Sequence, residues 1–466
     1  MKTKINKSGL KFMILVMLGL AIAASTVIAQ DRPLRRPPQP PQTTPEETEE
    51  ESPGPIIAIV GGKIYTVTQE IIREGTILVQ DGKILKAGQD LAVPEGAEVI
   101  DAAGRHLVPG FIALNASRIG VSGTTGGQNL VQDALNPFDQ NMQYLLGVGI
   151  TTVCSSTGAG GQRGMRRTPQ PTPTAPEGVF GSTGQIVLKM TYGDIEGMFV
   201  KENPFYAVRS ASFRGGLNCF NWREELKRAQ SFIKAQDNQT DEGEGGRRGQ
   251  RPSANQDVVR LLQGEAVLRT DAQTIDQIRD MIIFSRSYGY RIILEGVDEG
   301  WLIADELGPA GVAAIITPRS TMTPQAGREE ITGGTMELAM HLERAGVPFA
   351  INAQSGSVSL GGMAGRDLQG LPLQAMFAVS GGCSEKSALA ALTIVPARMM
   401  GLQDRIGSIE AGKDADILIL DGHPLDYKTY VEKALVNGKV YYDRAAARIL
   451  PVFDRSFYEQ QIKIDK

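Results

Sequence analysis

Between residues 111 and 399, short apolar runs alternate with helix-like segments, and this alternation limits the possible folds more than any other feature of the sequence. Apolar runs at this spacing predict parallel β-strands joined by helical crossovers, the pattern of α/β proteins. The runs that we interpret as strands are residues 150–154, 185–190, 266–268, 291–294, 313–316 and 348–351.

Helices are predicted from capping residues and stop signals. Asn221 and Glu224 resemble a capping box, which predicts a helix that begins at Asn221. Ser384 is expected to cap another helix, and residues 336–345 are expected to form a third helix that ends before Gly346.

Hairpins are predicted near both ends of the folded region. Asp81-Gly82 and Asn437-Gly438 each separate two strand-like apolar runs. Such dipeptides suit two-residue hairpin turns, because these turns need a positive φ at both positions. We therefore expect one antiparallel strand pair around each dipeptide.

The first 29 residues have the composition of an export signal. Four lysines precede an apolar run over residues 12–28, and residues 27–29 supply a small-residue cleavage site. The run is too short for a membrane-spanning helix, and the Pro-rich stretch over residues 30–54 is typical of a disordered linker. We expect an exported bacterial protein, periplasmic or extracellular, that is not held in the membrane after signal cleavage.

Charge and cysteine content disfavour several classes of function. Removing the signal takes away four lysines and no acids, so the formal net charge moves from −4 to −8, which argues against nucleic-acid binding. Cys154, Cys219 and Cys383 are too few for a disulfide framework or a zinc cluster. We expect three buried free thiols; one disulfide with an odd thiol is the alternative.

Two long motifs carry a family resemblance. Residues 104–117 read GRHLVPGFIALNAS, and residues 404–422 read DRIGSIEAGKDADILILDG. Both segments resemble the amidohydrolase superfamily, in particular its imidazolonepropionase-like branch, whose metal-dependent barrels hydrolyse C–N bonds. The resemblance implies an α/β fold with a TIM-like (β/α)8 barrel and a small β-sandwich built from both chain ends.

The resemblance also divides the chain into parts. Besides the signal peptide over 1–29 and the linker over 30–54 that composition predicts, we expect a composite sandwich over 55–110 and 400–445, a barrel over 111–399 and a tail over 446–466. Loop insertions are expected at about 158–180 and 237–256. The glycines of the first insertion also raise the alternative of a phosphate cradle, but the prolines that follow exclude an immediate helix.

The family's metal ligands are replaced in this chain. Such a hydrolase holds its metal with several His and an Asp, and the metal lowers the pKa of bound water toward ~7. We therefore predict no cofactor, although the family would use zinc or another divalent metal, and we assign no catalytic residue. The resemblance aligns the ligand positions and the catalytic Asp with Asn115, Ser117, Leu268, Thr270, Gly296 and Gln354.

The three histidines of the chain fall outside these ligand positions. His106 precedes the Pro-Gly turn of the first motif, where we expect a partly buried, hydrogen-bonded side chain. His341 lies in a predicted helix, where a surface or packing role is expected, and His423 lies in a loop, where a surface position is expected.

Two alternatives for metal binding stay open. Glu295, Asp298 and Glu299, together with Asp271, could hold Mg²⁺ or Ca²⁺ with oxygen ligands, or could instead cap a helix and contact solvent. Lys189 aligns with a strand where some relatives bridge metals through a carboxylated lysine; a structural lysine is the alternative that we favour.

The sequence thus predicts a secreted amidohydrolase-like protein with a degenerate metal site, inactive in the hydrolysis of cyclic imides or amides. The alternative is a small-molecule-binding protein, or a partner subunit of an active amidohydrolase paralogue. A homo- or hetero-oligomer is expected, without nucleic acid. The predicted pocket residues are Asn115, Ser117, Lys189, Thr270, Glu295, Asp298 and Gln354.

Overall fold

The computed structural model describes the part of the chain from residue 54 to residue 446, with gaps. The predicted signal peptide, almost all of the linker and nearly all of the tail lie outside it, as does the first loop insertion. Among the described residues, no helix is long and apolar enough to cross a membrane. The described ranges are 54–122, 134–156, 185–208, 216–241, 254–319, 332–359 and 366–446.

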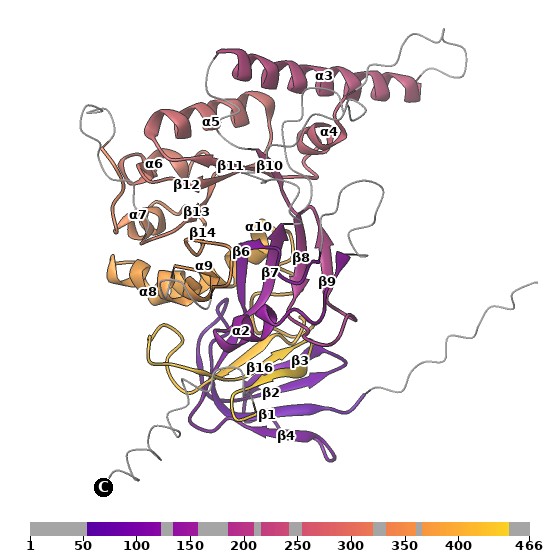
Figure 1. The fold of residues 1–466 in the computed structure, drawn as a ribbon, viewed down its shortest axis with the longest axis vertical. Helices are drawn as coiled ribbons and strands as arrows, with labels where there is room; N and C mark the ends of the chain where they lie inside the picture. Colours follow the sequence, from indigo (N-terminus) through magenta and orange to yellow (C-terminus); the bar gives the residue numbers. More distant parts are fainter. Residues whose placement is uncertain are drawn as a thin grey trace, which may run out of the picture. The chain divides into compact units, whose positions relative to one another are not determined.

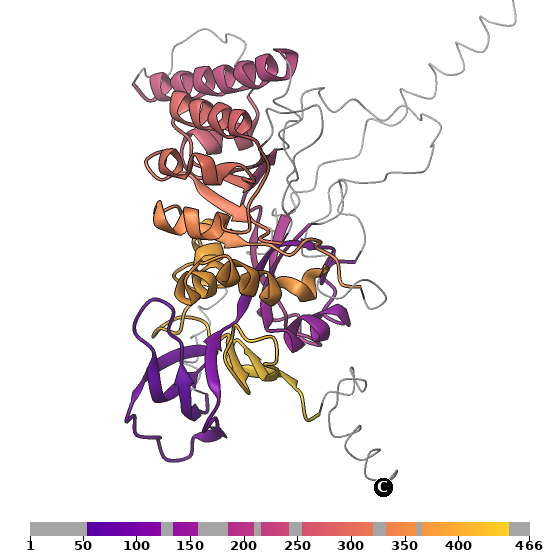
Figure 2. The ribbon, with the colours of Figure 1, turned by 90° about the vertical axis from the view of Figure 1, so that its left-hand side faces the viewer.

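Strands from both ends of the chain form one eight-stranded sheet, which we call the terminal sheet (Figures 1 and 2). Its order is β17-β16-β15-β5-β1-β2-β3, with β4 paired to β1. The two ends meet where β5 pairs antiparallel with β15, so that Pro109 lies opposite Ile417. The strands are β1 (Ile57–Ile64), β2 (Ile72–Gln80), β3 (Lys83–Gln89), β4 (Glu98–Asp101), β5 (His106–Pro109), β15 (Ile417–Leu420), β16 (Val431–Val436) and β17 (Lys439–Asp443).

Both predicted hairpins are confirmed in this sheet. Asp81-Gly82 joins β2 to β3 and Asn437-Gly438 joins β16 to β17, and all four residues have φ between 48° and 76°. A Cβ on Gly438 would lie 2.9 Å from Val79 Cγ1 and 3.2 Å from Gly82 Cα. Gly438 is therefore needed both for its backbone conformation and for the close approach of the two turns.

A five-stranded sheet in the middle of the chain is parallel throughout, in the order β10-β11-β12-β13-β14. Helices α5 to α7 lie along it (Figure 1), and α5 lies between β11 and β12 in the chain. The predicted parallel strands with helical crossovers are confirmed in this half. The strands are β10 (Tyr206–Val208), β11 (Leu268–Ala272), β12 (Ile292–Gly296), β13 (Ala313–Ile316) and β14 (Phe349–Ile351).

The other middle sheet, β6-β7-β8-β9, departs from the prediction. β6 (Phe111–Ser117) and β7 (Ile150–Ser156) are parallel, but β8 (Gln185–Lys189) runs antiparallel to β7, and β9 (Phe199–Glu202) antiparallel to β8. The expectation that the run at 185–190 continues the parallel pattern is wrong. The connection from β8 to β9 over residues 190–198 is too short for a parallel crossover, which needs a dozen or more residues, so these two strands pair as antiparallel neighbours.

The described strands outside the terminal sheet therefore form two separate middle sheets and no closed barrel. A buried apolar cluster joins these two sheets and contains Leu114 of β6, Val187 of β8, and Ile293 of β12. The opposite face of the five-stranded sheet packs against helices, because Leu268 and Leu294 belong to the core that includes α5. Side chains alternate along each strand, so we call these the inner and the outer face.

The helix predictions are confirmed in part. Ser384 caps α9 and its side chain accepts a hydrogen bond from Ser387 N, and α7 covers most of residues 336–345. The capping box at Asn221 is wrong, because α3 begins at Gly216 and no Gly or Pro at 217–220 interrupts it. The helices are α2 (Asn141–Gly147), α3 (Gly216–Asp241), α4 (Gln256–Leu262), α5 (Ile275–Tyr288), α6 (Ala304–Leu307), α7 (Leu338–Arg344), α8 (Leu371–Ser380), α9 (Glu385–Leu392) and α10 (Ile394–Met399), with 3-10 turns η3 (Gly300–Leu302) and η4 (Leu368–Gly370).

The range of the second predicted insertion, at about 237–256, includes the end of one helix and the start of another. Residues 237–241 belong to α3, and Asn255 caps α4 by accepting a hydrogen bond from Asp257 N. Residues 242–253 lie outside the described residues.

Candidate functional site

Two of the aligned ligand positions lie on the outer face of the five-stranded sheet. Leu268 is fully buried and Thr270 is 2% exposed, and they share the face of β11 that packs against helices. The inner-face positions of β11 are Arg269 and Asp271, because side chains alternate along a strand. Thr270 therefore lies on the opposite face of the sheet from the other predicted pocket residue of this region, Glu295.

Gly296, aligned with another ligand, has a backbone that suits glycine. It ends β12 with φ +96°, a conformation that L side chains rarely adopt, and a Cβ would lie 3.1 Å from Gln273 Cγ. A side chain such as histidine at this position would therefore be strained.

Arg269 occupies the inner face between the two middle sheets. Its Nη1 donates to Leu114 O at 2.8 Å, and Nε and Nη2 lie 3.0 and 2.9 Å from the same carboxylate oxygen of Glu295. The guanidinium carbon also lies 5.5 Å from the centroid of the Phe205 ring. The side chain of Arg269 is only 7% exposed, whereas that of Glu295 is 37% exposed.

Two asparagines complete this cluster. Asn352 Nδ2 donates to the second oxygen of Glu295 at 3.1 Å, and Asn115 Nδ2 donates to Ala353 O at 3.0 Å. The amide oxygens of Asn115 and Asn352 are buried and have no hydrogen-bond partner among the described residues. Buried acceptors are rarely left unpaired, so these two oxygens are suited to a donor from a ligand or an ordered water.

The segment after β14 adjoins the end of β6. Ser117 N donates to Gly356 O at 2.7 Å, and a Cβ on Gly356 would lie 1.7 Å from Asn115 O. Gln354, half-buried, lies in this same segment. The structure therefore brings the Asn115–Ser117 end of β6, Glu295 and the Gln354 segment around Arg269.

Sequence reasoning missed Arg269 and Asn352. The sequence does contain a sign of this pair. Arg269 is a charged residue next to an apolar run, and Glu295 lies near the end of the next strand. Recognising the pair required the relative register of β11 and β12, which places Asp271, two residues after Arg269, opposite Glu295.

The acidic residues do not converge on a metal site. Glu299 is 1% exposed, and its carboxylate accepts hydrogen bonds from Ile275 N and Gly333 N, both at 3.0 Å. This favours helix capping, since Ile275 is the first residue of α5. Burial, followed by the charge of Glu299, raises the pKa of Asp298 to about 6. Among the described residues, no group of three or more His, Cys, Asp or Glu is placed to hold a metal ion.

Lys189 lies apart from Arg269 and faces the terminal sheet. Its Nζ is 2.8 Å from Asp414, 3.0 Å from Asp416 and 2.5 Å from the amide oxygen of Asn437, and its side chain is fully buried. Burial alone would raise the pKa of Asp414, but Lys189 and Arg405 outweigh it and hold that pKa below its usual value. The favoured structural role of Lys189 agrees with these contacts.

The remaining histidines and cysteines lie away from the Arg269 cluster as well. His106 is half-buried, and its Nδ1 is 2.9 Å from the hydroxyl of Tyr65. His341 lies in α7, 3.8 Å from Glu337, as expected for a helix-surface residue. The thiols of Cys154 and Cys383 are buried and free, and burial raises the pKa of each to about 12; the Cys219 side chain lies outside the described residues.

The chain is similar to known proteins both in sequence and in structure. Residues 292–445 match the model of the amidohydrolase family. The C-terminal third of the chain is amidohydrolase-like. A crystal structure of an amidohydrolase from Thermotoga maritima superposes with a TM-score of 0.64 and 22% identity, covering 83% of this chain and all of that one. At this identity the superposition shows the fold alone, an α/β fold of the amidohydrolase type.

Curated relatives match over shorter segments. A dihydroorotase from Mycobacterium tuberculosis is 54% identical over 39 residues, 8% of this chain and 9% of that protein. An N-acetylglucosamine-6-phosphate deacetylase from Danio rerio is 27% identical over 156 residues, 33% of this chain and 35% of that protein. The chain therefore covers far less than two thirds of these curated relatives.

Proposed function

We propose that this chain is an exported member of the amidohydrolase superfamily in which Arg269, Glu295 and Asn352 have replaced the metal centre. The proposal rests on the position of the Arg269 guanidinium, 2.8 Å from Leu114 O. Leu114 directly precedes Asn115-Ala116-Ser117, which stands where the resembled family has its His-x-His motif. We further propose that the two middle sheets correspond to parts of a TIM-like barrel.

A guanidinium in this place disfavours metal chemistry. Arg remains protonated at any ordinary pH, so its fixed positive charge repels a divalent cation. It also holds the carboxylate of Glu295, the acidic side chain nearest to it. The charge of Glu295 is therefore neutralised by Arg269 and not by a metal ion. In this proposal the protein does not catalyse metal-dependent C–N hydrolysis.

Small-molecule binding is a second candidate function for the same place. The buried amide oxygens of Asn115 and Asn352 lack partners among the described residues, and the Glu295 side chain is 37% exposed. All three groups accept hydrogen bonds, so the fitting ligand would present N–H donors, as amides and ammonium groups do.

The direct test measures metal and activity together. The full chain, purified without chelator, is analysed for bound metals and then assayed with added Zn²⁺ or Mn²⁺ on dihydroorotate and on a simple cyclic imide. We expect less than about 0.1 equivalent of metal and no hydrolysis above background, because the ligands that metal affinity depends on are absent. One equivalent of bound metal, with hydrolysis that a chelator abolishes, would contradict the proposal.

A further inference from the structure

A cavity that no residue of the Arg269 cluster lines lies between the terminal sheet and α9. Its volume is about 260 Å³, and its walls come from the end of β1 with the residues that follow it, from α9 and from the loop after β15. His106 and His423, two of the three histidines in the chain, gather at this place. Nothing in the family resemblance assigns a role to it.

An aromatic group forms the base of the cavity. Tyr65 is 5% exposed, and its ring centroid lies 5.6 Å from that of His106 and 5.7 Å from that of His423. Burial, then the charges of Lys63 and His423, lower the pKa of His106. The neutral imidazole can therefore accept a hydrogen bond from the Tyr65 hydroxyl across the 2.9 Å contact. This hydrogen bond fixes the orientation of the Tyr65 ring.

Two lysines among the lining residues are free to meet an anionic group. Lys63 Nζ is held 5.1 Å above the centroid of the Tyr65 ring, and Lys386 extends from α9. Within the described part of the chain, neither lysine has a carboxylate oxygen within 4.0 Å. Glu385 lies instead 3.5 Å from His423, and Glu70 is exposed.

Three large apolar side chains also line the cavity. These are Ile71, Leu389 and Leu425, of which Ile71 is 49% exposed. A ligand that covered Ile71 would gain about 25 cal/mol for each Å² of apolar surface removed from water. The volume lies just below the range of ~300–1,000 Å³ typical of ligand pockets, so the ligand must be small.

We propose that this cavity binds a small organic carboxylate, with its anionic group at Lys63 and Lys386 and its apolar body against Ile71, Leu389 and Leu425. A single negative charge fits better than a phosphate, because Glu70 and Glu385 also line the cavity and repel a dianion. The site is independent of the Arg269 cluster and of any hydrolytic activity.

Titration calorimetry of the full chain with benzoate tests the proposal. We expect benzoate to bind, benzamide to bind much more weakly, and Lys63→Gln or Lys386→Gln to weaken benzoate binding by about tenfold, the loss of one charge-assisted contact. Lys86→Gln is the matched control, because Lys86 is an exposed lysine on β3 that does not line the cavity. Lys386 is itself exposed, so this variant tests the site even if Lys63→Gln fails to fold.

Several results would overturn the carboxylate site. These are an absence of benzoate binding, equal binding of benzoate and benzamide, or unchanged binding by both lysine variants. Tighter binding of inorganic phosphate than of benzoate would also overturn it, since it would show that the apolar side chains contribute nothing. Metal content and hydrolysis play no part in this assay, so its outcome is separate from that of the proposed function.

Discussion

Lys189 and Arg269 are buried cations that each meet a carboxylate, and they differ in the exposure of their partners. Lys189 contacts Asp414 and Asp416, whose side chains are 7% and 5% exposed. Arg269 contacts Glu295, which is 37% exposed. In the first case both signs of charge are buried, whereas in the second the anion still reaches solvent.

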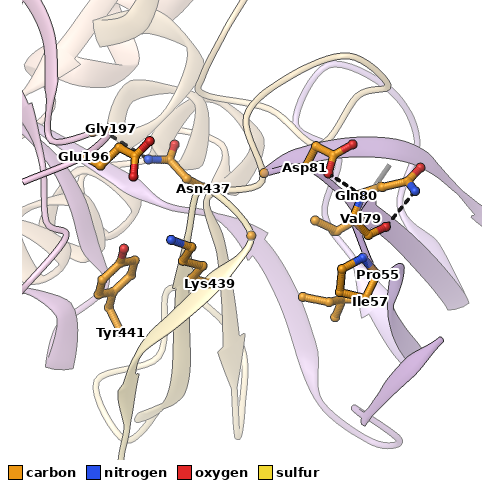
Figure 3. A pocket seen from close by; sticks show the side chains of 13 residues that line it. Pro55, Ile57, Val79, Gln80, Asp81, Glu196, Gly197, Asn437, Lys439 and Tyr441 are labelled. Atoms are coloured by element: carbon orange, nitrogen blue, oxygen red, sulfur yellow. Dashed lines mark hydrogen bonds between the residues drawn. The ribbon is translucent and has the colours of Figure 1, made fainter. Parts of the chain in front are cut away.

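This difference indicates a structural role for the ion pairs of Lys189 and a candidate binding role for the Arg269–Glu295 pair. Lys189 belongs to β8, and its aspartate partners lie within residues 404–422, just before or next to β15, so the ion pairs tie a middle sheet to the terminal sheet. Asn437 of the β16–β17 turn also accepts a hydrogen bond from Lys189 and donates one to Gly197 O. Both Asn437 and Gly197 line the surface pocket drawn in Figure 3. Glu295, by contrast, retains exposed surface with which a ligand could interact.

The largest expected effect is that of Lys189→Met. Removing the cation leaves two buried aspartates, of which Asp414 keeps Arg405 at 2.9 Å and Asp416 has no second cation within 4.0 Å among the described residues. We expect the free energy of unfolding to fall by about 3–5 kcal/mol, measured by urea denaturation. Lys439→Met is the control, because its pair with Asp194 is exposed and contributes about 0–1 kcal/mol.

The double variant Lys189→Met with Asp416→Asn sharpens this test. Neutralising Asp416 removes the unpaired buried charge, so the double variant should be more stable than Lys189→Met alone, a coupling that a double-mutant cycle measures. A loss below 1 kcal/mol in Lys189→Met would show that the buried ion pairs do not hold the two sheets together.

The second prediction uses the asymmetry of the Arg269–Glu295 pair. Glu295→Ala leaves a buried guanidinium without its anion, whereas Arg269→Met leaves a glutamate that can contact water. We expect losses of about 3 kcal/mol for Glu295→Ala and about 1–2 kcal/mol for Arg269→Met. Equal losses from the two variants, seen by the same denaturation assay, would contradict the view that the anion is the exposed partner.

Much of the fold could be predicted from local pattern. The Asp81-Gly82 and Asn437-Gly438 turns, the Ser384 cap and the parallel strands β11 to β14 follow from short-range rules that the structure obeys. The direction of β8 could not be predicted, because an apolar run of five residues reads the same in parallel and antiparallel pairing.

The site was harder to predict than the fold. Alignment to the family selected Leu268 and Thr270, but the pleat of β11 directs those side chains to the outer face and Arg269 to the inner face. A one-residue difference in a strand reverses the face of every side chain. The contact between Arg269 and Leu114 joins residues 155 apart in the chain, so it depends on how two sheets pack, which no local pattern encodes.

The smallest expected effect concerns Asp298, a carboxylate that lacks the cation found in both pairs. Burial and Glu299 raise its pKa to about 6, so the folded state binds a proton more readily than the unfolded chain. Its contribution to stability is fully present below pH ~4 and is lost as the pH rises toward ~6. Asp298→Asn should therefore unfold like the wild type near pH 4 and be more stable by about 1–2 kcal/mol at pH 7–8. Thermal unfolding at both pH values measures this difference. A gain of the same size at pH 4 would mean that the raised pKa is not its cause, and a loss at pH 7 would mean that the ionised carboxylate has a partner that stabilises it.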